Sequence, residues 1–248
     1  MQIVIPMAGE ARRFRDQGVT TPKPLLDVFG IPLAVRSALS IADHGQNQYL
    51  FVALKEHKKW GIESRIIEHI PNSQFIFIDQ VTSGPIATCL VAVNKIDKNL
   101  PVVFNDCDHV FQSSEFNTFL QEQNKSSLNG SALIYFESSD SRFSYVKTKK
   151  IDGKEIVQFA AEKKVISNYA VCGVYNFETV QLFSNIAEKY LANKSKSERF
   201  MIEIIDDLAR NSYPINAIRA QFHKSLGTPE EYNSAVNDLE FQRFCSGI

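Results

Sequence analysis

A loop close to the start of the chain carries the residues best suited to bind phosphate. The apolar run Ile3–Pro6 leads into Met7–Ala11, where small residues let backbone amide groups approach an anion closely. Arg13 and Lys23 follow and supply positive charge, and a proline on each side of Lys23 limits the freedom of its backbone. This pattern predicts a polyphosphate site, although an ordinary strand-to-helix turn with two surface cations would contain the same residues.

Two aspartates form a second candidate group, in Asp106-Cys107-Asp108. They follow the strand-like run Val102–Asn105, and open α/β sheets bind ligands at the ends of such strands. Carboxylates there suit Mg²⁺, which takes hard oxygen ligands, so Asp108 is the expected metal ligand and Asp106 a second one. The same D-x-D spacing is typical of metal-dependent glycosyltransferases that use nucleotide sugars, and turn-capping aspartates would also show it.

The hydrophobic pattern predicts a sheet that could hold these groups. Short apolar runs predict buried strands at Ile3–Pro6, Tyr49–Ala53, Gln74–Ile78 and Val102–Asn105. Apolar residues three and four apart predict helices between them, at Pro32–Ala42, Glu56–Ile70 and Gly84–Val93. The alternation of strand and helix favours a mainly parallel, Rossmann-like α/β sheet flanked by helices.

The second half of the chain changes character. Four strand candidates follow one another without long helices, at Ser131–Phe136, Phe143–Thr148, Ile156–Phe159 and Tyr169–Phe177. Asp152-Gly153 predicts a hairpin turn, so the mixed sheet should contain an inserted antiparallel hairpin region. Helices are expected again over residues 178–191 and 198–210, and Thr228 to Glu231 predict a helix start with a capping box.

Composition excludes several classes of protein. The 248 residues are 44% hydrophobic and 22% charged, which is typical of a globular chain, and the net charge of −1 lacks the basic excess of a nucleic-acid-binding domain. The four cysteines are too far apart for a zinc or redox motif and fit a reducing compartment. The longest apolar stretch is far shorter than the ~20 residues of a membrane span, and we expect no secretory signal. We therefore expect a cytoplasmic protein with neither a nucleic-acid nor a membrane partner.

The N-terminal residues resemble the signature of the sugar-phosphate nucleotidyltransferases. That signature is a glycine-rich loop ending in Arg-Phe, then Pro-Lys-Pro-Leu-Leu and Gly-x-Pro, here within residues 6–14, 22–26 and 30–32. Later stretches resemble a subgroup associated with capsule and surface-polysaccharide clusters, including phosphoglutamine cytidylyltransferases: Glu56-His57, Asp79–Gly84, Asn105–Asp108, Ser144–Lys147, Ala161–Lys164, Gly173–Phe177 and Leu226–Glu230.

The resemblance implies a fold and a reaction. The fold is the nucleotidyltransferase, or GT-A-like, fold in a single domain, with a nucleotide-binding part over 1–130 and an acceptor-binding part with C-terminal helices over 131–248. The implied enzyme joins a nucleoside monophosphate from an NTP, with CTP favoured, to a phosphorylated small molecule such as a sugar phosphate or phosphoglutamine. It releases pyrophosphate and uses Mg²⁺ as cofactor.

The resemblance also implies roles for individual residues. Ala8, Gly9 and Glu10 line the nucleotide, and Gln80 and Gly84 face the base. The catalytic cations are Arg13, Lys23 and Lys163, and the acceptor is bound by Tyr145, Glu162 and Lys163. Plainer alternatives stay open for some of them: a helix cap for Gly84, a polar strand end for Gln80, a surface ion pair for Glu162 and Lys163, and core packing for Tyr145.

Two departures from the family pattern leave alternatives open. Ala11 stands where the family has a second glycine, and alanine adopts a positive φ less readily. No aspartate precedes Gly227-Thr228, where the family has its second metal carboxylate, and Lys224 nearby is either a substitute charge or a surface lysine. A metal-dependent glycosyltransferase and a non-catalytic nucleotide-binding module therefore remain as alternatives, and the oligomeric state is not predicted.

Overall fold

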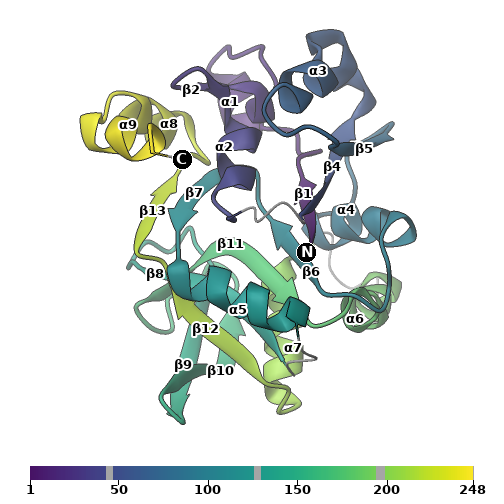
Figure 1. Cartoon of the computed structure of the whole chain (residues 1–248), viewed down its shortest axis with the longest axis vertical. Helices are drawn as coiled ribbons and strands as arrows, with labels where there is room; N and C mark the ends of the chain where they lie inside the picture. The colour runs from purple at the N-terminus through teal and green to yellow at the C-terminus, as the bar shows by residue number, and fades with distance from the viewer. Residues whose placement is uncertain (43–46, 126–129, 194–198, 248) are drawn as a thin grey trace.

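The computed structural model describes residues 1–42, 47–125, 130–193 and 199–247, and this part of the chain is built around a nine-stranded sheet (Figure 1). The strands lie in the order β5-β4-β1-β6-β11-β8-β12-β10-β9. Their bounds are β1 Gln2–Pro6, β4 Gln48–Leu54, β5 Gln74–Ile78, β6 Val102–Asn105, β8 Ser131–Glu137, β9 Tyr145–Ile151, β10 Lys154–Ala161, β11 Tyr169–Phe177 and β12 Ile215–Arg219.

The sheet is mixed, which confirms the predicted fold class. β1 pairs in parallel with β4 and β6, and β4 pairs in parallel with β5. β11 runs antiparallel to both β6 and β8, and β12 returns parallel to β8. The hairpin predicted at Asp152-Gly153 joins β9 to β10, and Asp152 takes the positive φ of 49° that such a turn requires. The carboxyl ends of β1, β4, β5 and β6 therefore share one edge.

Helices cover both faces of the sheet. α4 (Pro85–Ala92), α6 (Val180–Ala192) and α7 (Met201–Arg210) pack on one face, and α2 (Leu33–Leu39), α3 (Ile62–Ile67) and α5 (Ser114–Lys125) pack on the other. Figure 1 shows α5 crossing the face turned toward the viewer. Alternate side chains of β1 divide between the two cores: Val4 lies with the first group of helices, and Ile3 and Ile5 lie with the second.

A third, smaller core joins the N-terminal loop region to the C-terminal end. It brings Phe14 of α1 (Arg12–Asp16), Leu226, and Phe241 of α9 (Leu239–Cys245) into one buried cluster. The other elements around it are the strand pairs β2 (Asp27–Val28) with β3 (Ile31–Pro32) and β7 (His109–Gln112) with β13 (Phe222–Ser225), and helix α8 (Pro229–Val236). Thr228 caps α8 with the predicted capping box, completed by Glu231. The C-terminal segment is thereby held close to the loop after β1.

The structure differs from the predicted elements in a few places. The helix predicted over Glu56–Ile70 is two pieces, the 3-10 helix η2 (Lys55–Trp60) and α3, because Gly61 between them adopts a left-handed φ of 65°. The pattern also did not predict α5, α9, β12 or the two small strand pairs. Two further 3-10 turns are η1 (Lys23–Leu25) and η3 (Val93–Lys95).

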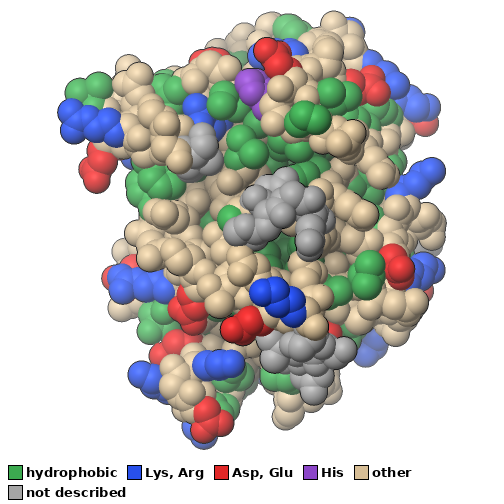
Figure 2. All heavy atoms as spheres, viewed as in Figure 1, with side chains coloured by type: hydrophobic (Ala, Val, Ile, Leu, Met, Phe, Trp, Pro, Cys, Tyr) green, Lys and Arg blue, Asp and Glu red, His purple; other side chains and the backbone are tan. Residues whose placement is uncertain are grey.

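No helix in the described ranges is long and apolar enough to cross a membrane. Figure 2 shows positive and negative side chains interspersed over one face of the molecule, as the near-zero net charge suggests. Any strong positive field at a phosphate site must therefore come from a few converging residues.

Candidate active site

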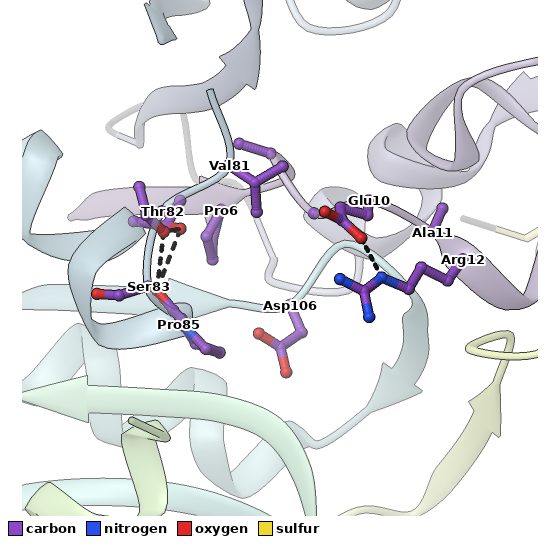
Figure 3. A pocket seen from close by; sticks show the side chains of 13 residues that line it. Pro6, Glu10, Ala11, Arg12, Val81, Thr82, Ser83, Pro85 and Asp106 are labelled. Carbon is purple, nitrogen blue, oxygen red and sulfur yellow. Dashed lines mark hydrogen bonds and ion pairs between the residues drawn. The ribbon is translucent and has the colours of Figure 1, made fainter. Parts of the chain in front are cut away.

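Three loops at the carboxyl edge of the parallel strands enclose a cavity of about 660 Å³, which we call the main cavity (Figure 3). The loops follow β1, β5 and β6, which are neighbours or near-neighbours in the sheet. Five residues predicted for the site line its wall: Ala8, Gly9, Glu10, Gly84 and Asp106. The position agrees with the rule that open α/β sheets bind ligands outside the carboxyl ends of their strands.

The loop after β1 keeps a left-handed residue at its end despite the missing glycine. Ala11 has φ 49° and ψ 40° and immediately precedes helix α1. A left-handed conformation costs a non-glycine residue roughly 1–2 kcal/mol, so the chain sustains strain here. The departure at Ala11 therefore leaves this backbone conformation in place.

Replacing Ala11 by glycine should stabilise the protein. The Ala11→Gly change removes the clash between Cβ and the backbone, and we expect the free energy of unfolding to rise by up to about 1 kcal/mol. Urea denaturation of both proteins measures this difference. Glycine also gains freedom in the unfolded chain, so a clear loss of stability would mean that Ala11 is not strained.

Two neighbouring arginines at the start of α1 point to different surroundings. Arg12 lines the main cavity, and its Nε donates a hydrogen bond to the Glu10 carboxylate (Figure 3). Arg13, the predicted catalytic arginine, is exposed and is not among the residues that line the cavity. Sequence reasoning missed Arg12 because successive helical residues point about 100° apart, and only the start of α1 decides which one faces the cavity.

Lys23 and Asp108 form an ion pair beside the main cavity. Only 17% of the Lys23 side chain and 18% of the Asp108 side chain are exposed. Burial disfavours both charges, but the Lys23 ammonium lowers the pKa of Asp108 to about 2, and Asp108 raises the pKa of Lys23. The structure thus brings together Lys23, a predicted catalytic cation, and Asp108, the expected metal ligand, and both are charged at neutral pH.

Asp106 lies next to this pair, and its side chain packs against Gly173, where any larger residue would collide with it. Its backbone N–H donates to the Gly173 carbonyl at 2.9 Å, and a Cβ on Gly173 would lie 2.6 Å from Asp106 Oδ2. Burial and the nearby Asp108 charge raise the pKa of Asp106 to about 8. Two carboxyl groups this close favour a cation between them, because both can ionise only if positive charge is supplied.

The side chains around Asp108 fit a divalent cation. Asp106, Asp108 and His109 each offer one ligand atom, and these atoms lie within 4.8 Å of one another. The two carboxylates supply the hard oxygen ligands that Mg²⁺ prefers. His109 contributes differently: its Nε2 lies 3.7 Å from Asp108 Oδ1, and its Nδ1 lies 2.8 Å from His223 Nε2. His109 therefore lies near Asp108 and is hydrogen-bonded to His223.

The Gly227-Thr228 turn also lies beside Asp108, but it brings no aspartate there. A Cβ on Gly227 would lie 3.1 Å from Asp108 Oδ2 and 3.7 Å from the Ser225 hydroxyl. Glu231 is also near, but one of its oxygens accepts the Thr228 N–H at 3.0 Å in the capping box. Lys224 is engaged elsewhere, since its Nζ lies 2.6 Å from Asp238, the N-cap of α9. Lys224 therefore has a structural partner.

The expected acceptor residues separate into two groups. Glu162 accepts a hydrogen bond from Ser144, and Lys163 Nζ lies 3.4 Å from Glu162 Oε1 and 4.6 Å from the Phe200 ring centre. The Glu162 charge also contributes to the raised pKa of Asp106, after burial and Asp108. Tyr145 is fully buried, and its hydroxyl donates to the Asp140 carbonyl at 2.7 Å. Tyr145 therefore agrees with the packing alternative.

The wall opposite the phosphate loop is the start of α4. Gly84 is the N-cap residue of α4 with φ 138°, and Thr82 and Thr88 line the cavity beside it with their hydroxyl groups 2.6 Å apart. Gln80 is exposed and is not one of the lining residues. The two threonines were not predicted, because their hydroxyl groups meet only once the chain enters α4 after Gly84.

Comparisons with known proteins agree on the architecture. A family model described as nucleotidyl transferase matches residues 3–242. The nucleoside-diphosphate-sugar pyrophosphorylase from Vibrio cholerae RC9 is similar in structure, with a TM-score of 0.80 and 22% identity over 95% of this chain and 100% of that one. The inositol-1-phosphate CTP transferase from T. maritima has a TM-score of 0.76 and 11% identity, over 99% of this chain and 94% of that chain.

A third similar structure is the UDP-glucose pyrophosphorylase from Acinetobacter baumanii, with a TM-score of 0.72 and 16% identity over 99% of this chain and 97% of that one. No curated protein sequence matches the chain at a significant level. At these identities the solved structures establish the fold, and the family model adds the family.

Proposed function

The chain belongs to the nucleotidyl transferase family, and on this premise we propose that it transfers a nucleoside monophosphate from an NTP to a phosphorylated small molecule and releases pyrophosphate. The observation that supports this most is the grouping of two parts: the loop Ala8–Ala11 and Asp106 line the main cavity, and the buried ion pair of Lys23 with Asp108 lies next to Asp106. Residues 1–130 form the nucleotide part, and residues 131–248 supply the acceptor part.

The proposed chemistry needs positioning and charge compensation. A phosphate oxygen of the acceptor is already anionic when it attacks the α-phosphorus, so no general base is required. Lys23 is suited to hold the α-phosphate, because its ammonium group already contacts the Asp108 carboxylate. The flexible lysine side chain can also follow a moving phosphoryl group. Asp106 and Asp108 would hold Mg²⁺, which supplies further positive charge to the phosphates. Lys163 would carry the acceptor phosphate, beside Glu162.

Arg12 enters this proposal as a cation that grips the triphosphate. Its guanidinium is bound to the neighbouring Glu10 at the wall of the main cavity and can exchange that carboxylate for a phosphate with two parallel hydrogen bonds. We expect Arg12→Ala to raise the KM for the NTP by about tenfold, with a smaller effect on kcat, because one charge-assisted contact contributes about 1.5–3 kcal/mol. Pyrophosphate release at varied NTP concentration measures this. An unchanged KM would remove Arg12 from the nucleotide site.

We propose CTP as the preferred nucleotide and a sugar phosphate or phosphoglutamine-like molecule as the acceptor, for capsule or surface-polysaccharide synthesis. The resemblance of the later sequence stretches supports these finer statements, and a CTP-using enzyme has the same fold. Each of the four common NTPs should be tested against sugar 1-phosphates, phosphocholine and phosphoglutamine with a pyrophosphate readout. Faster turnover with another base would reject the CTP preference and leave the transfer reaction intact.

One observation favours a second candidate. Asp106 and Asp108 form a D-x-D pair at the sheet edge, as in metal-dependent glycosyltransferases. Such an enzyme would use a nucleotide sugar and release a nucleoside diphosphate, and it would not need Lys23 beside a triphosphate. Identifying the released product distinguishes the two reactions. NTP binding without turnover on any acceptor would instead support a nucleotide-binding module.

A further inference from the structure

A second cavity of about 420 Å³ lies behind the loop that follows β1. The backbone of Gly9, Glu10 and Ala11 separates it from the main cavity, because these three residues line both. Its opposite wall is η2, through His57, Lys59 and Trp60. The proposed transfer reaction uses only the main cavity and gives the second cavity no role.

One residue of this wall has an unmet hydrogen-bonding group. Only 5% of the His57 surface is exposed, and its Nδ1 has no hydrogen-bond partner within the described part of the chain. Burial lowers the pKa of His57, so the imidazole is neutral at neutral pH. A buried polar group without a partner costs roughly 1–3 kcal/mol, and a ligand in this cavity that displaces the wall slightly could satisfy it.

The charges around the cavity favour an anionic ligand. Arg15, Lys23 and Lys59 line it, against the carboxylates of Glu10 and Glu56. Glu10 is already bound by Arg12 and Arg15, at 3.4 Å for the Arg15 contact, which reduces its repulsion of an anion. Arg15 and Lys23 come from the N-terminal region and Lys59 from η2, and only the fold brings Lys59 to the other two.

We propose that the second cavity is an additional oxyanion site, which takes inorganic pyrophosphate or the phosphate group of a small metabolite. Arg15 and Lys59 hold the charge, and the His57 ring donates or accepts the remaining hydrogen bond. Because Gly9, Glu10 and Ala11 border both cavities, an anion bound here alters the affinity of the main cavity for its phosphate ligand, and the coupling is reciprocal. This coupling rests on the proposed function, whereas the binding itself does not.

The single tryptophan of the chain makes the site measurable. Trp60 lines the cavity, so its fluorescence reports an anion there without any turnover. The full chain is titrated with inorganic pyrophosphate and, separately, with inorganic phosphate. We expect a saturable change with at least one of them, and Lys59→Ala should weaken the apparent affinity by about tenfold, as loss of one charge-assisted contact predicts. The tighter of the two anions shows whether product or phosphate metabolite is the better ligand.

Matched variants locate the binding. Lys55 belongs to the same 3-10 helix, pairs with Asp79 and is not among the residues that line the cavity. Lys55→Ala should therefore leave the titration unchanged. His57→Leu should weaken the apparent affinity for the anion while raising thermal stability, because it removes one hydrogen bond to the anion and a buried polar atom that otherwise lacks a partner. A merely structural histidine would instead lower stability on replacement.

Two results would overturn the proposal: no saturable change in Trp60 fluorescence with either anion, or an apparent affinity that neither Lys59→Ala nor His57→Leu alters. The coupling has its own readout. Phosphate should shift the KM for the NTP in the Lys55→Ala protein and not in Lys59→Ala. A chain that binds the anion at Trp60 but catalyses no transfer would refute the proposed function alone.

Discussion

Lys23→Ala should lower the rate of pyrophosphate release by about a thousandfold, the range seen when one preorganised charge donor is removed from a reacting centre. The ammonium group of Lys23 lies at the junction of the phosphate loop and Asp108, and only 17% of its side chain is exposed. A cation in such a partly dry place interacts strongly with a phosphoryl group. The effect should fall mainly on kcat, because Lys23 stabilises the negative charge that develops on the phosphates in the transition state.

Controls for this prediction come from the same chain. Lys23→Arg keeps the charge and should keep more activity than Lys23→Ala. Lys224→Ala removes a lysine whose ammonium group is paired with Asp238. It is given no part in the reaction, so its removal should leave the rate unchanged. Circular dichroism and thermal unfolding check that each variant is folded, since Lys23→Ala leaves the partly buried Asp108 carboxylate without its partner. A near-normal rate in folded Lys23→Ala would exclude Lys23 from catalysis.

Asp108→Asn should lower activity by at least about a hundredfold and raise the Mg²⁺ concentration needed for half-maximal rate. The substitution keeps the size of the side chain and its hydrogen bond with Lys23, but removes the ionised ligand whose pKa of about 2 keeps it charged. Asp106 remains in the variant, but one carboxylate then stands where two would hold the ion. Rates measured over a series of Mg²⁺ concentrations, and in excess chelator, test this.

Asp152→Asn is the matched control, because it makes the same chemical change in the exposed turn between β9 and β10. Its rate and its Mg²⁺ dependence should equal those of the unmodified protein. Full activity of any of these proteins in excess chelator would contradict the assignment of Asp108 as a metal ligand.

Several features of the protein follow from the sequence alone. The order of strands and helices in the first half, the Asp152-Gly153 hairpin and the Thr228 capping box all depend on residues close together in the chain. The positions of Gly9 and Asp108 shortly after β1 and β6 also follow from local pattern, because residues after parallel strands must meet at one sheet edge.

The tertiary structure decided the rest, since it depends on contacts between distant segments. Whether Arg12 or Arg13 faces the main cavity depends on where α1 begins, and that start is set by the left-handed conformation of Ala11. The burial of Tyr145, the engagement of Lys224 by Asp238, and the space beside Gly173 that Asp106 fills are properties of packing. The sequence determined which chemical groups the protein has at the edge of its sheet, and long-range packing determined which of them point into a cavity, because side-chain direction and burial are set by neighbours that no local pattern specifies.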